Sequence, residues 1–81
     1  MKSKRMEYLG AVLRRERRLQ DKTLQQVAEA VGLKENTISA YEKGKIQIPI
    51  DNLDAICKYL NTNYIDLLKK VQKQLDQDTQ T

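Results

Sequence analysis

The stretch Leu24–Gly44, LQQVAEAVGLKENTISAYEKG, has the pattern of two short helices joined by a tight turn. Apolar side chains recur in its first part at the i, i+3, i+4, i+7 spacing that lines one face of an amphipathic helix. They are Leu24, Val27, Ala28 and Val31. Gly32 follows at once, and glycine readily adopts the left-handed backbone on which helices end. The sequence therefore predicts one helix over residues 24–31 and a second from about Glu35 to Lys43.

The second predicted helix separates its side chains into two faces. On a wheel of about 100° per residue, Ile38 and Tyr41 share one side with Glu42. The opposite side is polar at Asn36 and small at Ala40. A helix-turn-helix unit places such a face in the DNA major groove, which is about 12 Å wide. An ordinary surface helix would show the same pattern, so the wheel alone leaves both interpretations open.

Thr23 stands directly before the first of these helices, and Gln26 follows three residues later. This spacing is that of a capping box, in which the hydroxyl accepts from a backbone N–H and the amide reaches back. The helix is therefore predicted to begin at Leu24.

Upstream, a helix is predicted from about Tyr8 to Leu19. Its buried stripe is expected to comprise Leu9, Val12, Leu13 and Leu19. Its second half contains a run of arginines, most of which are expected to be solvated: Arg14, Arg15, Arg17 and Arg18. Residues 1–7 are basic and poor in apolar side chains. They are predicted to form a flexible arm, which is either a simple mobile terminus or a DNA contact.

Downstream, residues 45–50 are predicted to form a loop, because Pro49 cannot continue a helix. Three isoleucines make this loop unusually apolar. Ile50 is expected to pack on the next helix, whereas Ile46 and Ile48 are left open between packing and a contact with a partner.

The fourth predicted helix begins after Asp51, which is a suitable N-cap. Its buried stripe is Leu53, Ile56, Cys57 and Leu60. Because Cys57 lies within this stripe, it is interpreted as a small core residue rather than a reactive thiol. Asn61 suits a left-handed position at the helix end, and Asn63 is expected to cap the next helix.

The last helix is predicted to begin near Tyr64. It is expected to add three residues to the core: Ile65, Leu67 and Leu68. Leu68, Val71 and Leu75 follow the i, i+3, i+7 spacing of a short coiled-coil seam. We interpret this seam as a dimer interface, with a frayed, partly exposed helix end as the alternative. The polar residues 76–81 are predicted to be disordered.

Length and composition narrow the class of protein. The 81 residues fit one small domain, and five short helices without a strand pattern predict an all-α fold. One Cys excludes an internal disulfide, and the lack of His removes the commonest metal and acid–base ligand. No apolar run approaches the roughly 20 residues of a membrane span, and the N-terminus lacks a signal-peptide core. The chain is therefore expected to be cytoplasmic.

The net charge of +4 is unevenly distributed. Residues 1–22 carry +5, residues 23–50 are neutral, and residues 51–81 carry −1. The basic end is suited to binding phosphate. A solvated helix face is the equally weighted alternative.

The segment TLQQVAEAVGLKENTISAYEKGK, Thr23–Lys45, resembles the lambda-repressor-like, Cro-type helix-turn-helix family, often called the XRE family. The residues that match the family pattern within this segment are Val27-Ala28, Gly32, Thr37-Ile38-Ser39, Tyr41-Glu42 and Gly44-Lys45. Leu13-Arg14 and Arg17 match it upstream, and Pro49 matches it downstream. The resemblance covers residues 8–70. It implies a compact five-helix domain that binds operator DNA, flanked by the 1–7 arm and by residues 71–81, which extend the last helix into a polar tail.

The resemblance also implies which side chains meet DNA. Base contacts fall on Glu35, Asn36 and Ala40, with Ser39 beside them. Phosphate contacts fall on Thr23, Lys34, Thr37, Lys43 and Lys45. Arg17 and Glu42 match a pair that forms a partly buried salt bridge between the first and third helices, a structural role.

The chain departs from the family pattern at several positions. Leu24 replaces a common Gln that touches phosphate, and Lys34 occupies the usual Ser/Thr cap position. Glu35 is acidic on a surface that would meet a polyanion, so its alternative role is to stabilise the first helical turn.

These features favour a sequence-specific DNA-binding transcription regulator, most simply a repressor that binds a pseudo-palindromic operator as a homodimer. The alternatives are an antitoxin that binds a toxin and its own promoter, and a helical adaptor that has lost DNA binding. An anti-repressor protein is a further conceivable partner. No nucleophile–base set, metal cluster or phosphate-binding glycine loop is present, so neither catalysis nor a cofactor or metal is expected.

Overall fold

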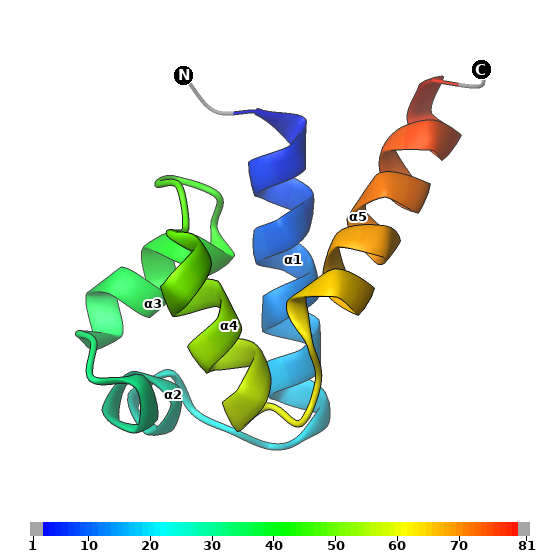
Figure 1. The fold of residues 1–81 in the computed structure, drawn as a ribbon. Helices are drawn as coiled ribbons and strands as arrows, with labels where there is room; N and C mark the ends of the chain where they lie inside the picture. The colour runs from blue at the N-terminus through cyan, green and yellow to red at the C-terminus, as the bar shows by residue number, and fades with distance from the viewer. Residues whose placement is uncertain (1–2, 80–81) are drawn as a thin grey trace.

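The computed structural model describes residues 3–79 and shows five α-helices and no strand within them (Figure 1). The helices are α1 Lys4–Leu19, α2 Leu24–Val31, α3 Glu35–Glu42, α4 Ile50–Tyr59 and α5 Tyr64–Thr79. α5 lies along one side of α1, while α2, α3 and α4 gather on its other side. The predicted all-α fold is confirmed.

α1 begins earlier than the sequence predicts. Ser3 is its N-cap, and the Ser3 Oγ accepts a hydrogen bond from the Met6 N–H at 3.1 Å. Residues 4–7 form the first turn of α1, so the predicted flexible arm is wrong there; residues 1–2 lie outside the described part. The capping hydroxyl and a hydrogen bond from Arg5 to α5 stabilise this turn, and neither interaction appears in a hydrophobic pattern.

The later helices also differ at their ends. Pro49, not Asp51, is the N-cap of α4, and the Pro49 carbonyl accepts the Leu53 N–H at 2.9 Å. Proline suits this position because the cap uses its carbonyl and has no need of the missing N–H. α5 continues to Thr79, so the predicted disorder from residue 76 is wrong as far as residue 79. The rest of the predicted tail, residues 80–81, lies outside the described part.

The turns that join these helices follow the sequence closely. Gly32 ends α2 with φ of 73°, and Asn61 follows α4 with φ of 57°, both in the left-handed region. Asn63 Oδ1 accepts the Asp66 N–H at 2.9 Å at the start of α5. The three predictions for these positions are confirmed.

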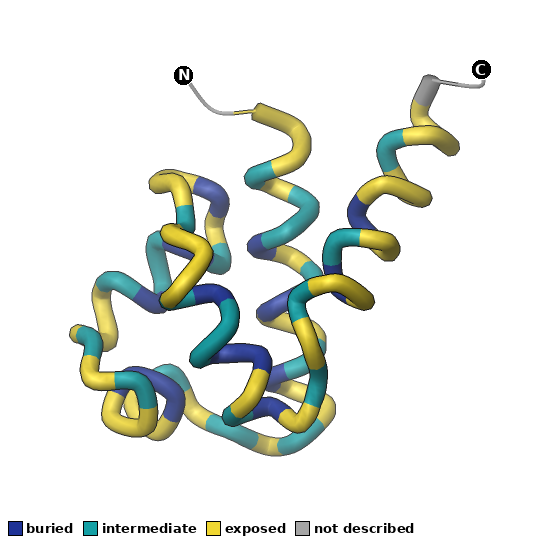
Figure 2. Tube along the Cα trace, viewed as in Figure 1, coloured by how far each residue is buried: buried dark blue, intermediate teal, exposed yellow. Residues whose placement is uncertain are grey.

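The helices share a buried core. It contains Leu13, Val27, Ala28, Ile38, Tyr41, Leu53, Ile56, Cys57, Leu60, Leu67 and Val71. Figure 2 shows the buried positions of each helix turned toward its neighbours. Three residues predicted to be buried are instead exposed: Leu19 by 67%, Ile50 by 57% and Ile65 by 55%. Each stands in the first or last turn of its helix, where the core ends before the apolar pattern does.

α1 and α3 approach so closely at Gly10 that their backbones touch. A Cβ built on Gly10 would overlap the Tyr41 carbonyl oxygen and would lie 2.6 Å from the Glu42 carbonyl oxygen. Both obstacles are backbone atoms at the end of α3, so no side chain can turn aside to make room. Gly10 therefore sets the spacing between α1 and α3, a role that the sequence pattern did not reveal.

Gly10→Ala is expected to destabilise the fold by about 3 kcal/mol, because the added methyl overpacks a contact between two backbones. Urea unfolding monitored by circular dichroism measures this loss. Gly32→Asn is the matched control: a Cβ there meets nothing within 4 Å, and asparagine tolerates the left-handed backbone. The control should lose less than about 1 kcal/mol, and equal losses in both variants would contradict the proposed role of Gly10.

Candidate nucleic-acid interface

The inner face of α3 is anchored in the core. Ile38 is 2% exposed and Tyr41 is 4% exposed. The Tyr41 hydroxyl accepts a hydrogen bond from Asn52 Nδ2 of α4 at 3.0 Å. α3 is therefore held by apolar packing on α1 and α2 and by a polar contact with α4. The sequence predicted the buried face, but the hydrogen bond from Asn52 was missed.

The outer face of α3 carries the side chains that the sequence assigned to DNA bases. Glu35 and Asn36 are exposed, and Ser39 and Ala40 are half-buried. Within residues 3–79, the Asn36 and Ser39 side chains make no hydrogen bond to another part of the chain. Their polar atoms are thus available to a ligand that approaches this face.

The turn before α3 leaves its N-terminus open. Lys34 is the N-cap, at the position where the family usually has Ser or Thr, and it makes no side-chain capping bond; the residue is exposed. The Lys34 carbonyl accepts the N–H groups of Thr37 and Ile38 at 3.0 and 3.2 Å. The N–H groups of Glu35 and Asn36 lie in the first turn of the helix, where no intrahelical acceptor exists. They add partial positive charge at the front of the outer face.

The N-terminus of α2 is partly satisfied by its own capping box. The Thr23 Oγ1 accepts the Gln26 N–H at 3.0 Å, and the Gln26 Oε1 accepts the Thr23 N–H at 2.8 Å, as predicted. These bonds use the Thr23 N–H, so Thr23 can offer a phosphate only its hydroxyl hydrogen. The N–H groups of Leu24 and Gln25 remain the orphan donors of this helix end.

Arg17 and Glu42 form the predicted ion pair between α1 and α3. The Arg17 Nε lies 2.7 Å from Glu42 Oε2 and the Arg17 Nη2 lies 3.0 Å from Oε1, which makes a bidentate pair. In a third bond, Arg17 Nη1 donates to the Lys22 carbonyl at 2.7 Å. The side chains are only 11% and 7% exposed. The hydrogen bond to Glu42 raises the pKa of Arg17, although burial acts in the opposite direction.

The remaining lysines with assigned phosphate contacts flank the end of α3. Lys43 is the C-cap residue, and Lys45 follows the left-handed Gly44; both lysines are exposed. Thr37, in the first turn of the helix, is half-buried. The structure therefore places one lysine at the start of α3 and two at its end.

The predicted dimer seam on α5 is partly buried within the single chain. Val71 is 1% exposed within the single chain, because α5 packs along α1 with its buried side turned inward (Figure 2). An ion pair between Lys70 Nζ and Glu16 Oε1 at 3.1 Å joins the same two helices. The prediction that Val71 contacts a second copy is therefore wrong. Leu68 and Leu75 are half-buried and keep part of their surface free.

Other kinds of site find little support in the described part of the chain. Residues 3–79 contain no group of three or more Cys, Asp or Glu side chains that could hold a metal ion. None of their helices is long and apolar enough to cross a membrane. Cys57 is fully buried, and burial, with smaller contributions from Asp54 and Glu16, raises the pKa of its thiol to about 11. This thiol is a core group, as predicted.

A family model described as helix-turn-helix matches residues 13–68. The chain belongs to the XRE-type helix-turn-helix family. The match runs from the middle of α1 into α5 and contains α2, α3 and α4 whole. The family and fold are those of DNA-binding regulators.

Relatives and solved structures agree with this assignment. The chain is 30% identical over 60 residues to the antitoxin PezA of Streptococcus pneumoniae. The matched stretch covers 74% of this chain but only 38% of PezA. Among solved structures, the clp gene regulator ClgR of Corynebacterium glutamicum has a TM-score of 0.86 at 27% identity, over 93% of this chain and 80% of its own. A single-residue mutant of the restriction-modification controller protein C.Esp1396I, bound to its highest-affinity operator site, has a TM-score of 0.77 at 21% identity. The match covers 88% of this chain and 93% of the mutant chain. This last likeness concerns the fold alone.

Arg17→Met is expected to lower the free energy of unfolding by about 3–5 kcal/mol, because it leaves the Glu42 carboxylate buried without a partner. Urea denaturation of the purified chain measures the loss. The double variant Arg17→Met/Glu42→Leu removes both charges and should recover most of the stability. If the double variant is no more stable than the single one, the cost does not come from an orphaned charge.

Proposed function

We propose that this chain is a sequence-specific transcription regulator that binds a pseudo-palindromic operator as a homodimer and represses by excluding polymerase. The observation that carries the proposal is the division of α3. Its inner face is fixed in the core, whereas the side-chain polar atoms of Asn36 and Ser39 on its outer face have no hydrogen-bond partner in residues 3–79. We place such a regulator in the cytoplasm.

The outer face has suitable chemistry for reading base edges. The Asn36 amide can bond bidentately to adenine N6 and N7, and the Glu35 carboxylate can accept from cytosine N4. Ala40 presents a methyl group to a thymine methyl, and Ser39 can donate to or accept from either base type. We assign base recognition to these four residues.

Phosphate binding is assigned to groups at both ends of the helix pair. Lys34 precedes α3, while Lys43 and Lys45 follow it, so the lysines bracket the outer face along its length. The Thr37 hydroxyl and the N-terminus of α2, with the Thr23 hydroxyl, complete the assignment. These contacts position the helix without reading sequence.

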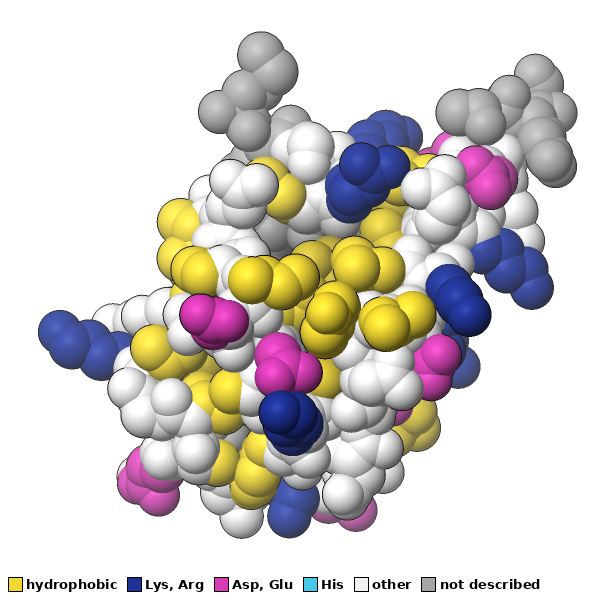
Figure 3. Space-filling model, viewed as in Figure 1, with side chains coloured by type: hydrophobic (Ala, Val, Ile, Leu, Met, Phe, Trp, Pro, Cys, Tyr) yellow, Lys and Arg dark blue, Asp and Glu magenta, His cyan; other side chains and the backbone are white. Residues whose placement is uncertain are grey.

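An apolar surface next to α5 supports the dimer. A groove of about 370 Å³ lies between the start of α1, the α3–α4 loop and α5, and Leu68 lies in its wall beside Ile46, Ile48 and Ile50. Figure 3 shows hydrophobic side chains gathered across the middle of this face, with charged side chains of both signs at its edge. We propose that Leu68 and this groove, with Leu75 farther along α5, meet a second copy, because a two-fold dimer matches a pseudo-palindromic operator.

Asn36→Ala should weaken binding by about 1–3 kcal/mol at one base position of each half-site, because it removes a bidentate base contact. Lys43→Ala should weaken binding to all duplexes alike and lower the slope of log K against log salt by about 1. Fluorescence anisotropy with duplexes selected by the wild-type chain measures both effects at several salt concentrations.

The control for this pair is Glu29→Ala, which alters an exposed side chain of α2 that lies outside the assigned contacts. The proposal fails if the wild-type chain binds every duplex equally. The assignment of roles within α3 fails if Lys43→Ala changes base preference and Asn36→Ala does not.

The double variant Ile50→Asp/Leu68→Asp should lower the sedimentation mass at micromolar concentration to that of a monomer, because it places charge in an apolar contact. Leu19→Asp is the matched control, since Leu19 is equally apolar and 67% exposed but lies at the far end of α1. A mass that stays unchanged in the double variant would remove this groove as the interface. Val71 is unsuitable for the test, because its substitution would disturb the single chain.

An antitoxin is the second candidate, and the relationship to PezA favours it. The isoleucine-rich groove would then bind a toxin in place of the second copy. The gene neighbourhood separates the two functions: an adjacent toxin gene favours the antitoxin, and a divergently transcribed promoter favours the repressor.

A further inference from the structure

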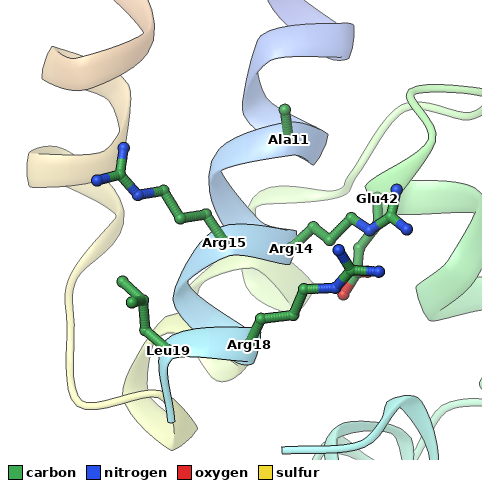
Figure 4. A pocket seen from close by; sticks show the side chains of 6 residues that line it. All are labelled: Ala11, Arg14, Arg15, Arg18, Leu19 and Glu42. Carbon is green, nitrogen blue, oxygen red and sulfur yellow. The ribbon is translucent and has the colours of Figure 1, made fainter. Parts of the chain in front are cut away.

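A basic depression lies on α1 beside the end of α3, outside every contact assigned above. It has a volume of about 500 Å³ and is lined by Ala11, Arg14, Arg15, Arg18, Leu19 and Glu42. Figure 4 shows the side chains of Arg14 and Arg18 running from α1 toward Glu42, whereas Arg15 runs the other way, toward α5. Two guanidinium groups thus converge on the α3 side of the depression.

The nearby carboxylates leave these two guanidinium groups without a counterion. Both oxygens of Glu42 are occupied by Arg17, at 2.7 and 3.0 Å. The Glu16 carboxylate of the same helix is paired with Lys70. Arg14 and Arg18 are exposed and form no ion pair within residues 3–79. On its α3 side the depression therefore carries two unneutralised positive charges beside the buried ion pair of Arg17 and Glu42.

The geometry of the two arginines suits a phosphodiester. They are four residues apart on one helix, so their side chains project from the same face at successive turns. Planar guanidinium groups bind phosphate oxygens bidentately and are less strongly hydrated than ammonium groups. The depression is also lined by Ala11 and Leu19, of which Leu19 points to the α5 side with Arg15 (Figure 4).

The position of the depression identifies which phosphodiester it would meet. It adjoins Glu42, the last residue of α3, and Lys43 and Lys45 follow directly in the chain. Residues 23–50, which contain the proposed base-reading face, have no net charge. The attraction that holds this face on a polyanion must therefore come in part from neighbouring cations.

We propose that Arg14 and Arg18 form a phosphate-binding subsite that holds the operator backbone beside the C-terminal end of α3. This inference rests on the proposed function. The subsite contributes affinity without sequence preference, and it keeps the duplex in place for Asn36 and its neighbours to read.

The test compares Arg14→Gln/Arg18→Gln with the wild-type chain by fluorescence anisotropy on a selected duplex from low to moderate salt. The double variant should lower the slope of log K against log salt by about 2, one for each lost phosphate contact. It should weaken binding equally on the selected duplex and on one with altered bases. Arg15→Gln removes the same charge from a side chain of the same depression that runs away from α3, toward α5, and should change the slope much less.

Arg14→Lys/Arg18→Lys keeps both charges and should restore most of the slope, while binding more weakly than the wild type because a lysine cannot form a bidentate bond. Circular dichroism of all variants checks that α1 is intact. The subsite is overturned if the double Gln variant has no greater effect per charge than Arg15→Gln. If the wild-type chain binds DNA without base preference, the proposed function fails, but the slopes of log K against log salt still decide whether the phosphate subsite exists. If the wild-type chain binds no DNA, the proposed function and the subsite both fail.

Discussion

The rest of the structure depends on the ion pair between Arg17 and Glu42. It joins the last turns of α1 and α3, and a third bond from Arg17 reaches the Lys22 carbonyl just before α2. Three segments of the helix-turn-helix region are thus tied to one guanidinium group. Because both charges are nearly buried, each is costly without the other, so the pair permits one arrangement of α1 relative to α3. The backbone contact at Gly10 sets how closely the two helices approach.

α3 itself supplies little of the stability of this arrangement. It is an eight-residue helix without a side-chain N-cap, and isolated helices of that length are unstable in water. Its position comes from burial of Ile38 and Tyr41 and from its neighbours. The side chains of the outer face therefore contribute little to stability, so they can be selected for recognition without weakening the fold.

The groups proposed to read DNA bases are consequently separate from those proposed to bind the DNA backbone. The outer face of α3 offers polar groups and a small side chain in a neutral segment, whereas unneutralised cations stand on α1 and at the ends of α3. The apolar groove beside α5 lies on a further surface (Figure 3). The side chains proposed for sequence recognition, for phosphate binding and for self-association are thus different, which makes each proposal separately testable by substitution.

The sequence by itself determined the helix order, the turn glycine, the capping box, the inner face of α3 and the pairing of Arg17 with Glu42, because these follow from local spacing and from family motifs. Only the tertiary structure decided where the core ends. Leu19, Ile50 and Ile65 continue an apolar pattern past the last packed neighbour, whereas Val71 was placed at a surface and is buried by α1. It also decided the role of Gly10 and the direction of Arg14 and Arg18. The physical reason is that periodicity states which face of a helix is apolar, but burial and charge compensation depend on which other helix lies opposite.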